Sequence, residues 1–263
     1  MPDAAAGAAG LTRILLLAAL PQEVRPFLRR SRVRRRRGLP WPAWEFSLGA
    51  VRGLVAVSGM GAPAAREAAS RLISQFQPHL VVSLGFGGAL SPELHPGDLV
   101  LGELFYECDP AAIVLDPVAA PAPPRPLAEL RRLLVAAGLP AFPGSLITTP
   151  WIIHKGRQGE PLLRLPLPVL DLESAVVAEL AGAAGLPFLG LRAITDGAAE
   201  EIPDFLAPAN AEPGTVGWLN ALGWLAADPR RLQDLVRLWR RSRLAAGRLA
   251  EALQVLLPFL ETL

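Results

Sequence analysis

Short apolar runs alternate along the chain with segments whose apolar residues recur every three or four positions. A short apolar run between turn signals is typical of a buried strand, and the longer spacing is typical of a helix with one buried face. The pattern predicts strands at 14–19, 44–48, 54–58, 80–84, 98–104, 146–149, 169–171 and 188–194. It predicts helices through Val24, Phe27 and Leu28, and at 64–76, 127–137, 173–184 and 229–260.

Strands that alternate with helices predict an α/β fold, in which a central mixed sheet is covered by helices on both faces. We expect one domain over residues 1–263, with a helical C-terminal extension from about residue 218. In such folds ligands bind at the carboxyl ends of the strands. Glu23, Ser58, Gly85 and Asp196 all follow predicted strands, so the fold is expected to bring them to one cleft.

The residues Val51-Arg52-Gly53 look like a turn, which predicts a hairpin between strands 44–48 and 54–58. Seven of the nine residues from Arg29 to Arg37 are arginine. The preferred interpretation of this cluster is a solvated loop. A surface for phosphate groups, anionic lipid or nucleic acid is the alternative, with the leucine-rich C-terminal helix as a second membrane contact.

Composition narrows the classes of protein that the chain can belong to. With 263 residues, of which 51% are hydrophobic, the chain can bury one large core. A single cysteine, Cys108, excludes an internal disulfide, and three scattered histidines make a metal cluster improbable. The apolar run from Ile14 to Leu20 is too short to span a bilayer. We therefore expect a soluble protein of the cytoplasm without a metal.

Six short motifs follow one another in an order that resembles the purine nucleoside phosphorylase and nucleosidase superfamily. Within it, the chain is most similar to methylthioadenosine/S-adenosylhomocysteine nucleosidases and to hopanoid-associated nucleoside phosphorylases. The resemblance covers roughly residues 12–200 and implies the three-layer fold of that superfamily. The motifs are Ala18-Ala19-Leu20-Pro21-Gln22-Glu23, Ser58-Gly59-Met60-Gly61, Gly85-Phe86-Gly87-Gly88-Ala89-Leu90, Pro96-Gly97-Asp98-Leu99-Val100, Asp171-Leu172-Glu173-Ser174 and Arg192-Ala193-Ile194-Thr195-Asp196.

The resemblance implies roles for three acids in cutting the bond between ribose and a purine. Positive charge develops on the sugar in such a reaction, and the purine departs more readily once its N7 is protonated. Asp196 would be the acid at N7, Glu173 would accept hydrogen bonds from the ribose 2′- and 3′-hydroxyls, and Glu23 would orient or deprotonate water. Leu172 stands where the family usually has methionine.

The remaining candidate residues follow from the same resemblance. Arg192 would position the nucleophile as a further catalytic residue, and Ser58 with the amides near Gly59 and Gly61 would line the same end of the site, together with Gly85. The purine would meet two apolar side chains. These are Trp151 and Ile152.

The same resemblance implies no cofactor, with phosphate as a co-substrate if the enzyme is a phosphorylase. It also implies a small purine nucleoside as the binding partner and a homodimer or larger homo-oligomer. No nucleic acid is expected as a partner.

Structural interpretations of these residues remain open at this point. Glu173 could stabilise a helix start, Asp196 could cap a helix, and Arg192 could be an ion-pair partner. The run Gly59-Met60-Gly61-Ala62-Pro63-Ala64 also fits the dinucleotide fingerprint, although no acid follows about 20 residues later. A non-catalytic nucleotide- or membrane-binding protein is the alternative from another class.

The choice of nucleophile and base rests on family comparison alone. The first turn, Leu20-Pro21-Gln22-Glu23, and the segment Gly85-Phe86-Gly87-Gly88 lack the glycine-rich loop and the arginine that phosphorylases use for phosphate. This favours hydrolysis over phosphorolysis. Phosphorolysis of an adenosyl compound stays open as the alternative, because hopanoid-associated members have similar loops and Arg192 or the Arg29–Arg37 cluster could hold phosphate. An aspartate at position 196 goes with 6-aminopurines in the family, which favours adenine. The group on the ribose 5′ carbon stays open.

Overall fold

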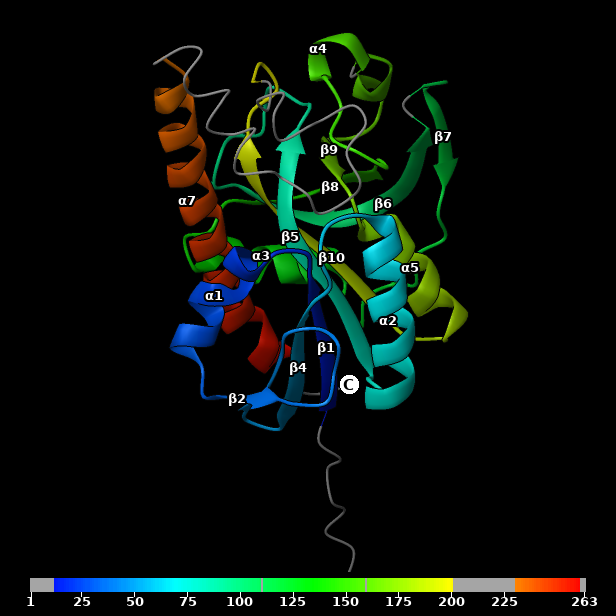
Figure 1. Cartoon of the computed structure of the whole chain (residues 1–263), viewed down its shortest axis with the longest axis vertical. Helices are drawn as coiled ribbons and strands as arrows, with labels where there is room; N and C mark the ends of the chain where they lie inside the picture. Colours follow the sequence, from blue (N-terminus) through cyan, green and yellow to red (C-terminus); the bar gives the residue numbers. More distant parts are fainter. Residues whose placement is uncertain (1–11, 110, 159, 201–229, 261–263) are drawn as a thin grey trace, which may run out of the picture.

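A central sheet lies between two layers of helices (Figure 1). The computed structural model describes residues 12–109, 111–158, 160–200 and 230–260. In Figure 1, helices α1, α3 and α7 cover one face of the sheet and α2 and α5 cover the other. The helical segments are α1 (Pro21–Arg30), α2 (Ala62–Phe76), α3 (Leu127–Ala136), α4 (Lys155–Gln158), the short 3₁₀ helix η1 (Glu160–Arg164), α5 (Ser174–Ala183) and α7 (Arg230–Phe259).

Ten strands in the described part of the chain form one mixed sheet. The order is β10-β6-β8-β9-β5-β1-β4-β3-β2, with β7 beside β6 and an additional pairing of β10 with β5. This extra pairing closes β5, β10, β6, β8 and β9 into a ring. The strands are β1 (Thr12–Ala18), β2 (Val33–Arg36), β3 (Ala43–Leu48), β4 (Val51–Val57), β5 (Leu80–Ala89), β6 (Leu99–Asp109), β7 (Val114–Pro117), β8 (Ala141–Thr148), β9 (Pro168–Asp171) and β10 (Phe188–Asp196). The predicted α/β fold with a mixed sheet and three layers is confirmed.

Strand β5 changes partners along its length, and this opens space for a site. Its first half pairs with β1 through Leu80–Ser83, whereas Gly88 and Ala89 pair with β9. Strand β1 ends at Ala18, so it does not accompany β5 any further. The backbone of β5 between Ser83 and Gly88 therefore borders on groups other than these two strands.

Each face of the sheet carries its own apolar core. One cluster joins alternate residues of β1, β4 and β5 to helices α1, α3 and α7, with Leu16, Phe27 and Leu253 among its buried members. The other joins the opposite residues of the same strands to α2 and α5, with Leu72 and Val177 among its members. Strands that are buried on both faces read as continuous apolar runs, and this explains the sequence pattern.

The hairpin between β3 and β4 is real, but its predicted turn was wrong. Leu48 pairs with Val51, so the turn consists of Gly49 and Ala50, and Gly49 has a φ of 57° that suits a tight hairpin. Gly53 lies inside β4. A Cβ there would come within 1.9 Å of the Phe46 ring, so this glycine makes room for an aromatic side chain instead of forming a turn.

Two further expectations need correction. The arginine cluster is not a loop: Arg29 and Arg30 end α1, and Val33–Arg36 form the edge strand β2. Helix α7 lacks a continuous apolar stripe, because Val236 and Trp239 are exposed whereas Leu249, Leu253 and Leu256 are buried. The predicted start of the extension near residue 218 lies outside the described residues. Among the residues described, no helix is both long and apolar enough to cross a membrane.

Candidate active site

Three acids from distant parts of the sequence line one cavity. Glu23 comes from the first turn of α1, Glu173 from the start of α5 and Asp196 from the end of β10. Each side chain is largely buried, as expected for acids that border the core. Of the four residues expected in one cleft, Glu23 and Asp196 line this cavity, whereas Ser58 and Gly85 do not; Glu173 lines it as well. The cavity is lined by Ala19, Leu20, Glu23, Met60, Phe86, Gly87, Gly88, Thr149, Ile152, Ile153, Lys155, Leu170, Asp171, Leu172, Glu173, Thr195 and Asp196.

Backbone amides from two strand ends hold Glu23 in place. Its Oε2 accepts hydrogen bonds from Ala19 N at 2.9 Å and Leu20 N at 2.7 Å, and its Oε1 accepts one from Phe86 N at 2.9 Å. Glu23 thus caps the first turn of α1. It also accepts the hydrogen bond of the Phe86 amide in β5, at a point that β1 does not reach. Burial raises the pKa of Glu23, although these amides and Arg192 oppose the rise. Glu23 is therefore fixed in position, and its raised pKa makes it a stronger base than an exposed glutamate.

A buried ion pair organises the opposite wall of the cavity. Arg192 Nε donates to Asp171 Oδ2 at 3.0 Å, and its Nη2 donates to Ser83 Oγ at 3.0 Å. The Asp171 Oδ1 atom accepts hydrogen bonds from Thr148 Oγ1 at 2.7 Å and from the amides of Glu173 and Ser174 at 3.1 Å. Burial alone would raise the pKa of Asp171, but the guanidinium and these donors outweigh it and hold the pKa below its ordinary value.

The start of α5 then directs Glu173 toward the cavity. Glu173 precedes the helix, and its Oε1 accepts a hydrogen bond from Gly61 N at 2.8 Å. Its Oε2 lies 4.0 Å from Arg192 Nη2. Burial raises the pKa of Glu173 to about 8, with the charge of Arg192 opposing the rise and Asp171 and Glu23 adding to it. Near neutral pH this carboxyl therefore carries a proton for much of the time.

This raised pKa predicts a pH dependence of stability that Glu173→Gln removes. A carboxyl whose pKa is higher in the folded state makes folding less favourable as pH rises from about 4.5 to about 8. We expect the free energy of unfolding of the wild type to fall across this window, by on the order of 2–5 kcal/mol from Glu173 alone. The measurement is urea unfolding at several pH values. Equal slopes for the wild type and Glu173→Gln would show that Glu173 ionises normally.

Asp196 is paired with a lysine that sequence reasoning missed. Lys155 Nζ donates to Asp196 Oδ2, and it also donates to the backbone oxygens of Gly197 at 2.9 Å and Asp196 at 3.3 Å. Thr195 Oγ1 donates to Asp196 Oδ1 at 2.6 Å. The side chains of Lys155 and Asp196 are only 4% and 6% exposed. The acid predicted to protonate the purine is therefore the centre of a buried, fully bonded network.

Two glycines of β5 leave room for the carboxylates. A Cβ at Gly85 would lie 2.8 Å from Glu23 Oε1, and a Cβ at Gly88 would lie 2.8 Å from Asp196 Oδ2. Real Cβ atoms do not approach other atoms so closely, so any side chain at either position would displace an acid. Gly85 therefore contributes to the site because it has no side chain to displace Glu23, although it does not itself line the cavity.

The structure separates the other predicted residues into two groups. Leu172 and Ile152 line the cavity, as predicted. Trp151 does not, and its side chain is 50% exposed. Arg192 lies behind the wall, where its guanidinium is bound by Asp171 and Ser83, so its contact with a nucleophile is not seen.

The glycine turn after β4 borders the cavity without lining it, apart from Met60. Ser58 Oγ donates to the backbone oxygens of Ala18 at 3.2 Å and Gly59 at 2.9 Å, which ties the turn to the end of β1. Gly59 and Gly61 have φ values of 92° and 91°, a region that favours glycine. The turn thereby aims the Gly61 amide at Glu173.

One sequence signal could have revealed Lys155. It is the only lysine in the chain, and the other 25 of the 26 basic residues are arginine. Asp171 was visible within its motif but was not singled out as the partner of Arg192. Met60, Phe86, Thr149, Ile153, Leu170 and Thr195 also line the cavity, and no pattern in the sequence distinguishes them from core residues.

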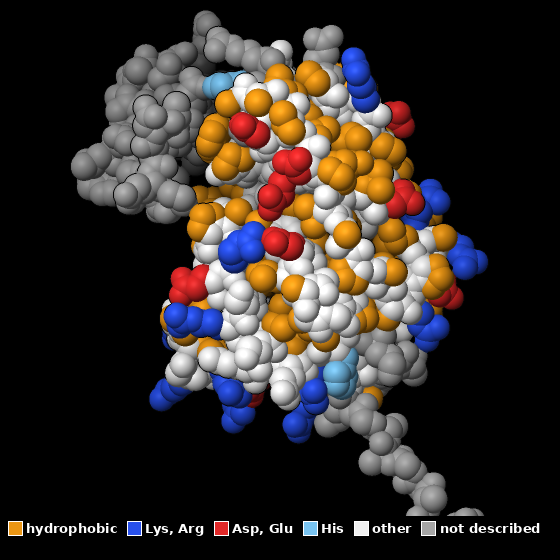
Figure 2. All heavy atoms as spheres, turned by 90° about the vertical axis from the view of Figure 1, so that its right-hand side faces the viewer, with side chains coloured by type: hydrophobic (Ala, Val, Ile, Leu, Met, Phe, Trp, Pro, Cys, Tyr) orange, Lys and Arg blue, Asp and Glu red, His pale blue; other side chains and the backbone are white. Residues whose placement is uncertain are grey.

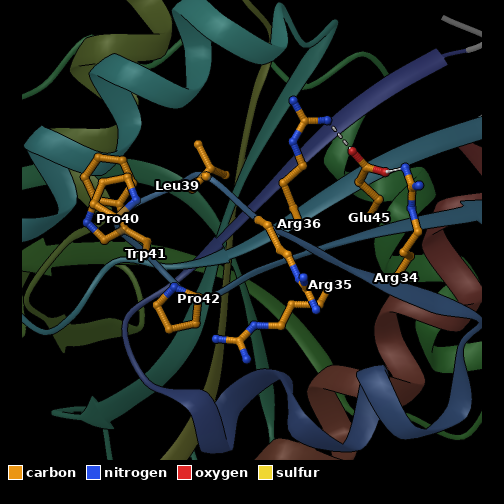
Figure 3. A pocket seen from close by; sticks show the side chains of 10 residues that line it. Arg34, Arg35, Arg36, Leu39, Pro40, Trp41, Pro42 and Glu45 are labelled. Carbon is orange, nitrogen blue, oxygen red and sulfur yellow. Dashed lines mark hydrogen bonds and ion pairs between the residues drawn. The ribbon is translucent and has the colours of Figure 1, made fainter.

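The arginine cluster forms a separate surface on the edge of the sheet. A hollow of about 1060 Å³ lies over Arg34–Arg37 and Trp41, and none of its lining residues lines the acid cavity. Figure 3 shows Arg34 and Arg36 on either side of Glu45, with which both form ion pairs. Figure 2 shows that basic side chains gather along the lower edge of the molecule, whereas acidic, basic and apolar side chains mix higher on that face.

Comparison with known proteins identifies the family of the chain. A family profile described as "Phosphorylase superfamily" matches residues 13–215. The chain belongs to this superfamily. A 5′-methylthioadenosine/S-adenosylhomocysteine nucleosidase of Geobacillus thermodenitrificans is 29% identical over 205 residues, which cover 71% of this chain and 84% of that enzyme. A nucleosidase of the same name from Geobacillus kaustophilus is 30% identical over 176 residues, which cover 60% of this chain and 73% of that enzyme.

Solved structures of superfamily members share the fold. The futalosine hydrolase of Helicobacter pylori superposes with a TM-score of 0.73 at 17% identity, covering 95% of this chain and 98% of that chain. A 5′-methylthioadenosine/S-adenosylhomocysteine nucleosidase of the same organism gives 0.72 at 17% identity, covering 95% and 99%. The prediction of an enzyme of the nucleosidase or nucleoside phosphorylase type is confirmed at this level.

Membership in the phosphorylase superfamily also decides against the dinucleotide fingerprint. In that fingerprint a phosphate binds at the helix N-terminus that follows the glycine turn. Here the Gly61 amide, which precedes α2, is bonded to the Glu173 carboxylate. The glycines therefore position an acid of the cavity.

Proposed function

We propose that the protein cleaves the N-glycosidic bond of an adenine nucleoside that carries a 5′ substituent, with water as the nucleophile. The observation that carries this proposal is that Glu23, Glu173 and Asp196 line one cavity. Their separate supports fix each acid independently, which suits three different tasks. The sequence relatives named above act as nucleosidases on adenine compounds, and this supports the choice of substrate.

Each acid has a role that fits its surroundings. Asp196 delivers a proton to N7 of the purine, whose ring packs against apolar residues such as Ile152 and Phe86. Glu173 meets the ribose hydroxyls, and in the fraction of molecules in which it is ionised its negative charge stabilises the sugar cation. Glu23 takes a proton from the water that attacks C1′. Leu172, close to Glu173, packs against the sugar.

The charges around the cavity favour water over phosphate. Phosphate needs free cationic donors, but the described residues that line the cavity include no arginine. Their one cation, Lys155, is bound by Asp196 and two backbone oxygens, and Arg192 is bound by Asp171. The ionised Asp171, and Glu23 when it is ionised, would repel an anion. Within the described part of the cavity no unpaired cation is available for phosphate, which supports water as the nucleophile; on this proposal the enzyme needs no co-substrate other than water.

The direct experiment measures adenine release from a panel of nucleosides, with and without phosphate. The panel contains adenosine, 5′-deoxyadenosine, 5′-methylthioadenosine and S-adenosylhomocysteine, with inosine as the control for the base. We expect adenine and the free sugar to form at a rate that phosphate does not change. A rate that requires phosphate, with a sugar 1-phosphate as product, would replace water as the nucleophile, and no release from any member would end the proposal.

A further inference from the structure

The proposed role of Asp196 leaves the source of its proton unassigned. A general acid must carry the proton that it delivers. In the structure, however, both oxygens of Asp196 accept hydrogen bonds, one from Lys155 Nζ and one from Thr195 Oγ1. A carboxylate bonded to an ammonium is the acceptor of that pair, and the available proton lies on the nitrogen. The nearest stored proton therefore belongs to Lys155.

Lys155 is held on Asp196 and shielded from water. Its Nζ donates to Asp196 Oδ2 and to the backbone oxygens of Asp196 and Gly197. Its side chain is 4% exposed, and its Cε would lie 3.3 Å from a Cβ at Gly88, so β5 packs closely against it. This placement directs the ammonium at the acid and leaves bulk water little access to the pair.

The type of cation matters for what it can do. Every other basic side chain of this protein is arginine, and Lys155 is the only lysine. An arginine guanidinium binds a carboxylate well but does not release its proton in proteins, whereas a lysine ammonium does so in buried surroundings. The Arg192–Asp171 pair is of the first type, in which the proton stays on the guanidinium. A lysine at Asp196 provides a pair whose proton can move.

We propose that Lys155 is a positioning residue that supplies, through Asp196, the proton that N7 of the purine receives. This inference rests on the proposed function. As the bond between C1′ and N9 breaks, its electron pair goes to the purine, N7 takes a proton from the Asp196 carboxyl, and Asp196 takes one from Lys155 Nζ. Water attacks C1′ and gives its proton to Glu23. After the products leave, Glu23 releases this proton to solvent and the neutral Lys155 amine regains one.

Two substitutions separate proton supply from charge and packing. Lys155→Gln keeps a hydrogen-bond donor beside Asp196 but has no proton to give, so kcat is expected to fall about 100-fold with KM changed less than about threefold. Lys155→Arg keeps the positive charge but holds its proton, so it is expected to lose as much. If Lys155→Arg keeps nearly the wild-type kcat, Lys155 contributes only its positive charge, and the proposal is overturned.

A double substitution tests whether Lys155 acts through Asp196. In the Asp196→Asn background the proton path is already broken, so adding Lys155→Gln is expected to lower kcat less than about threefold further. Losses that multiply would show that Lys155 acts on the substrate directly, against the proposal. This comparison holds even if Lys155→Gln alone folds poorly, because the double variant pairs two neutral amides. Thermal unfolding of each variant shows which of them are folded.

Failure of this inference can be distinguished from failure of the proposed function. A wild type that releases adenine, together with an equally active Lys155→Gln variant, would overturn the role of Lys155 alone. A folded wild type that releases no adenine from any nucleoside would end both proposals.

Discussion

Asp196→Asn is expected to fold and to release adenine about 10²- to 10⁴-fold more slowly than the wild type. An amide cannot protonate N7, and general acid assistance contributes a factor of this size, which corresponds to about 3–5 kcal/mol in the barrier. The amide has nearly the same shape as the carboxyl, and Lys155 keeps its bonds to two backbone oxygens. The measurement is kcat and KM for the best substrate of the panel, with circular dichroism as the test of folding.

The matched control for this prediction is Asp98→Asn. Asp98 lies just before β6, where its Oδ2 accepts a hydrogen bond from His95 N at 2.8 Å, and it does not line the cavity. This change removes the same charge elsewhere and is expected to leave turnover near the wild-type value. Wild-type turnover in folded Asp196→Asn would remove Asp196 from the mechanism.

Arg192→Met is expected to lower the free energy of unfolding by about 3–5 kcal/mol. The side chains of Arg192 and Asp171 are 1% and 0% exposed, so the change leaves a buried carboxylate without its cation. Breaking one side of such a pair costs about this much, because the remaining charge cannot be solvated. Since Asp171 also binds the amides of Glu173 and Ser174, the start of α5 is expected to loosen. The measurement is urea unfolding at pH 7.

Two controls separate this structural role from a catalytic one. Arg66→Met removes an arginine from an exposed ion pair with Glu179 and is expected to change stability little. The double variant Asp171→Asn/Arg192→Met removes both buried charges and is expected to recover part of the lost stability. If Arg192→Met is as stable as the wild type yet inactive, the guanidinium acts on the nucleophile, as the family resemblance implied.

Local patterns predicted the presence of the central strands well, but they predicted strand ends and turns poorly. Runs such as 80–84 and 188–194 are buried on both faces, so most of their residues are apolar and the strands are easy to recognise. The continuation of β5 through Gly85–Ala89 was missed because glycines read as a turn. Glycine is needed at positions 85 and 88 because the carboxylates of Glu23 and Asp196 lie against the backbone there. Such contacts join residues far apart in the sequence, so local patterns do not show them. The same limitation explains the misplaced hairpin turn at Gly53.

The acids could be predicted because each stands at the end of an apolar run in a motif of fixed order. Lys155 was missed although it is the only lysine, because the segment after β8 has no clear periodicity and its partner Asp196 lies 41 residues away. Trp151 was expected beside the base because the family resemblance places a base-contacting residue there, but this tryptophan is half exposed and does not line the cavity. Arg192 was recognised as important, while its bonds to Asp171 and Ser83 became apparent only in three dimensions.

A crystal structure of the Asp196→Asn variant with 5′-methylthioadenosine is the measurement that tests the central claim most directly. The account predicts one nucleoside in the acid cavity, with the side chain at position 196 at N7, Glu173 at the ribose hydroxyls and Glu23 facing a water molecule beside C1′. A nucleoside bound elsewhere, for example in the hollow over Arg34–Arg37, would contradict the account, as would one that contacts only one of the three positions.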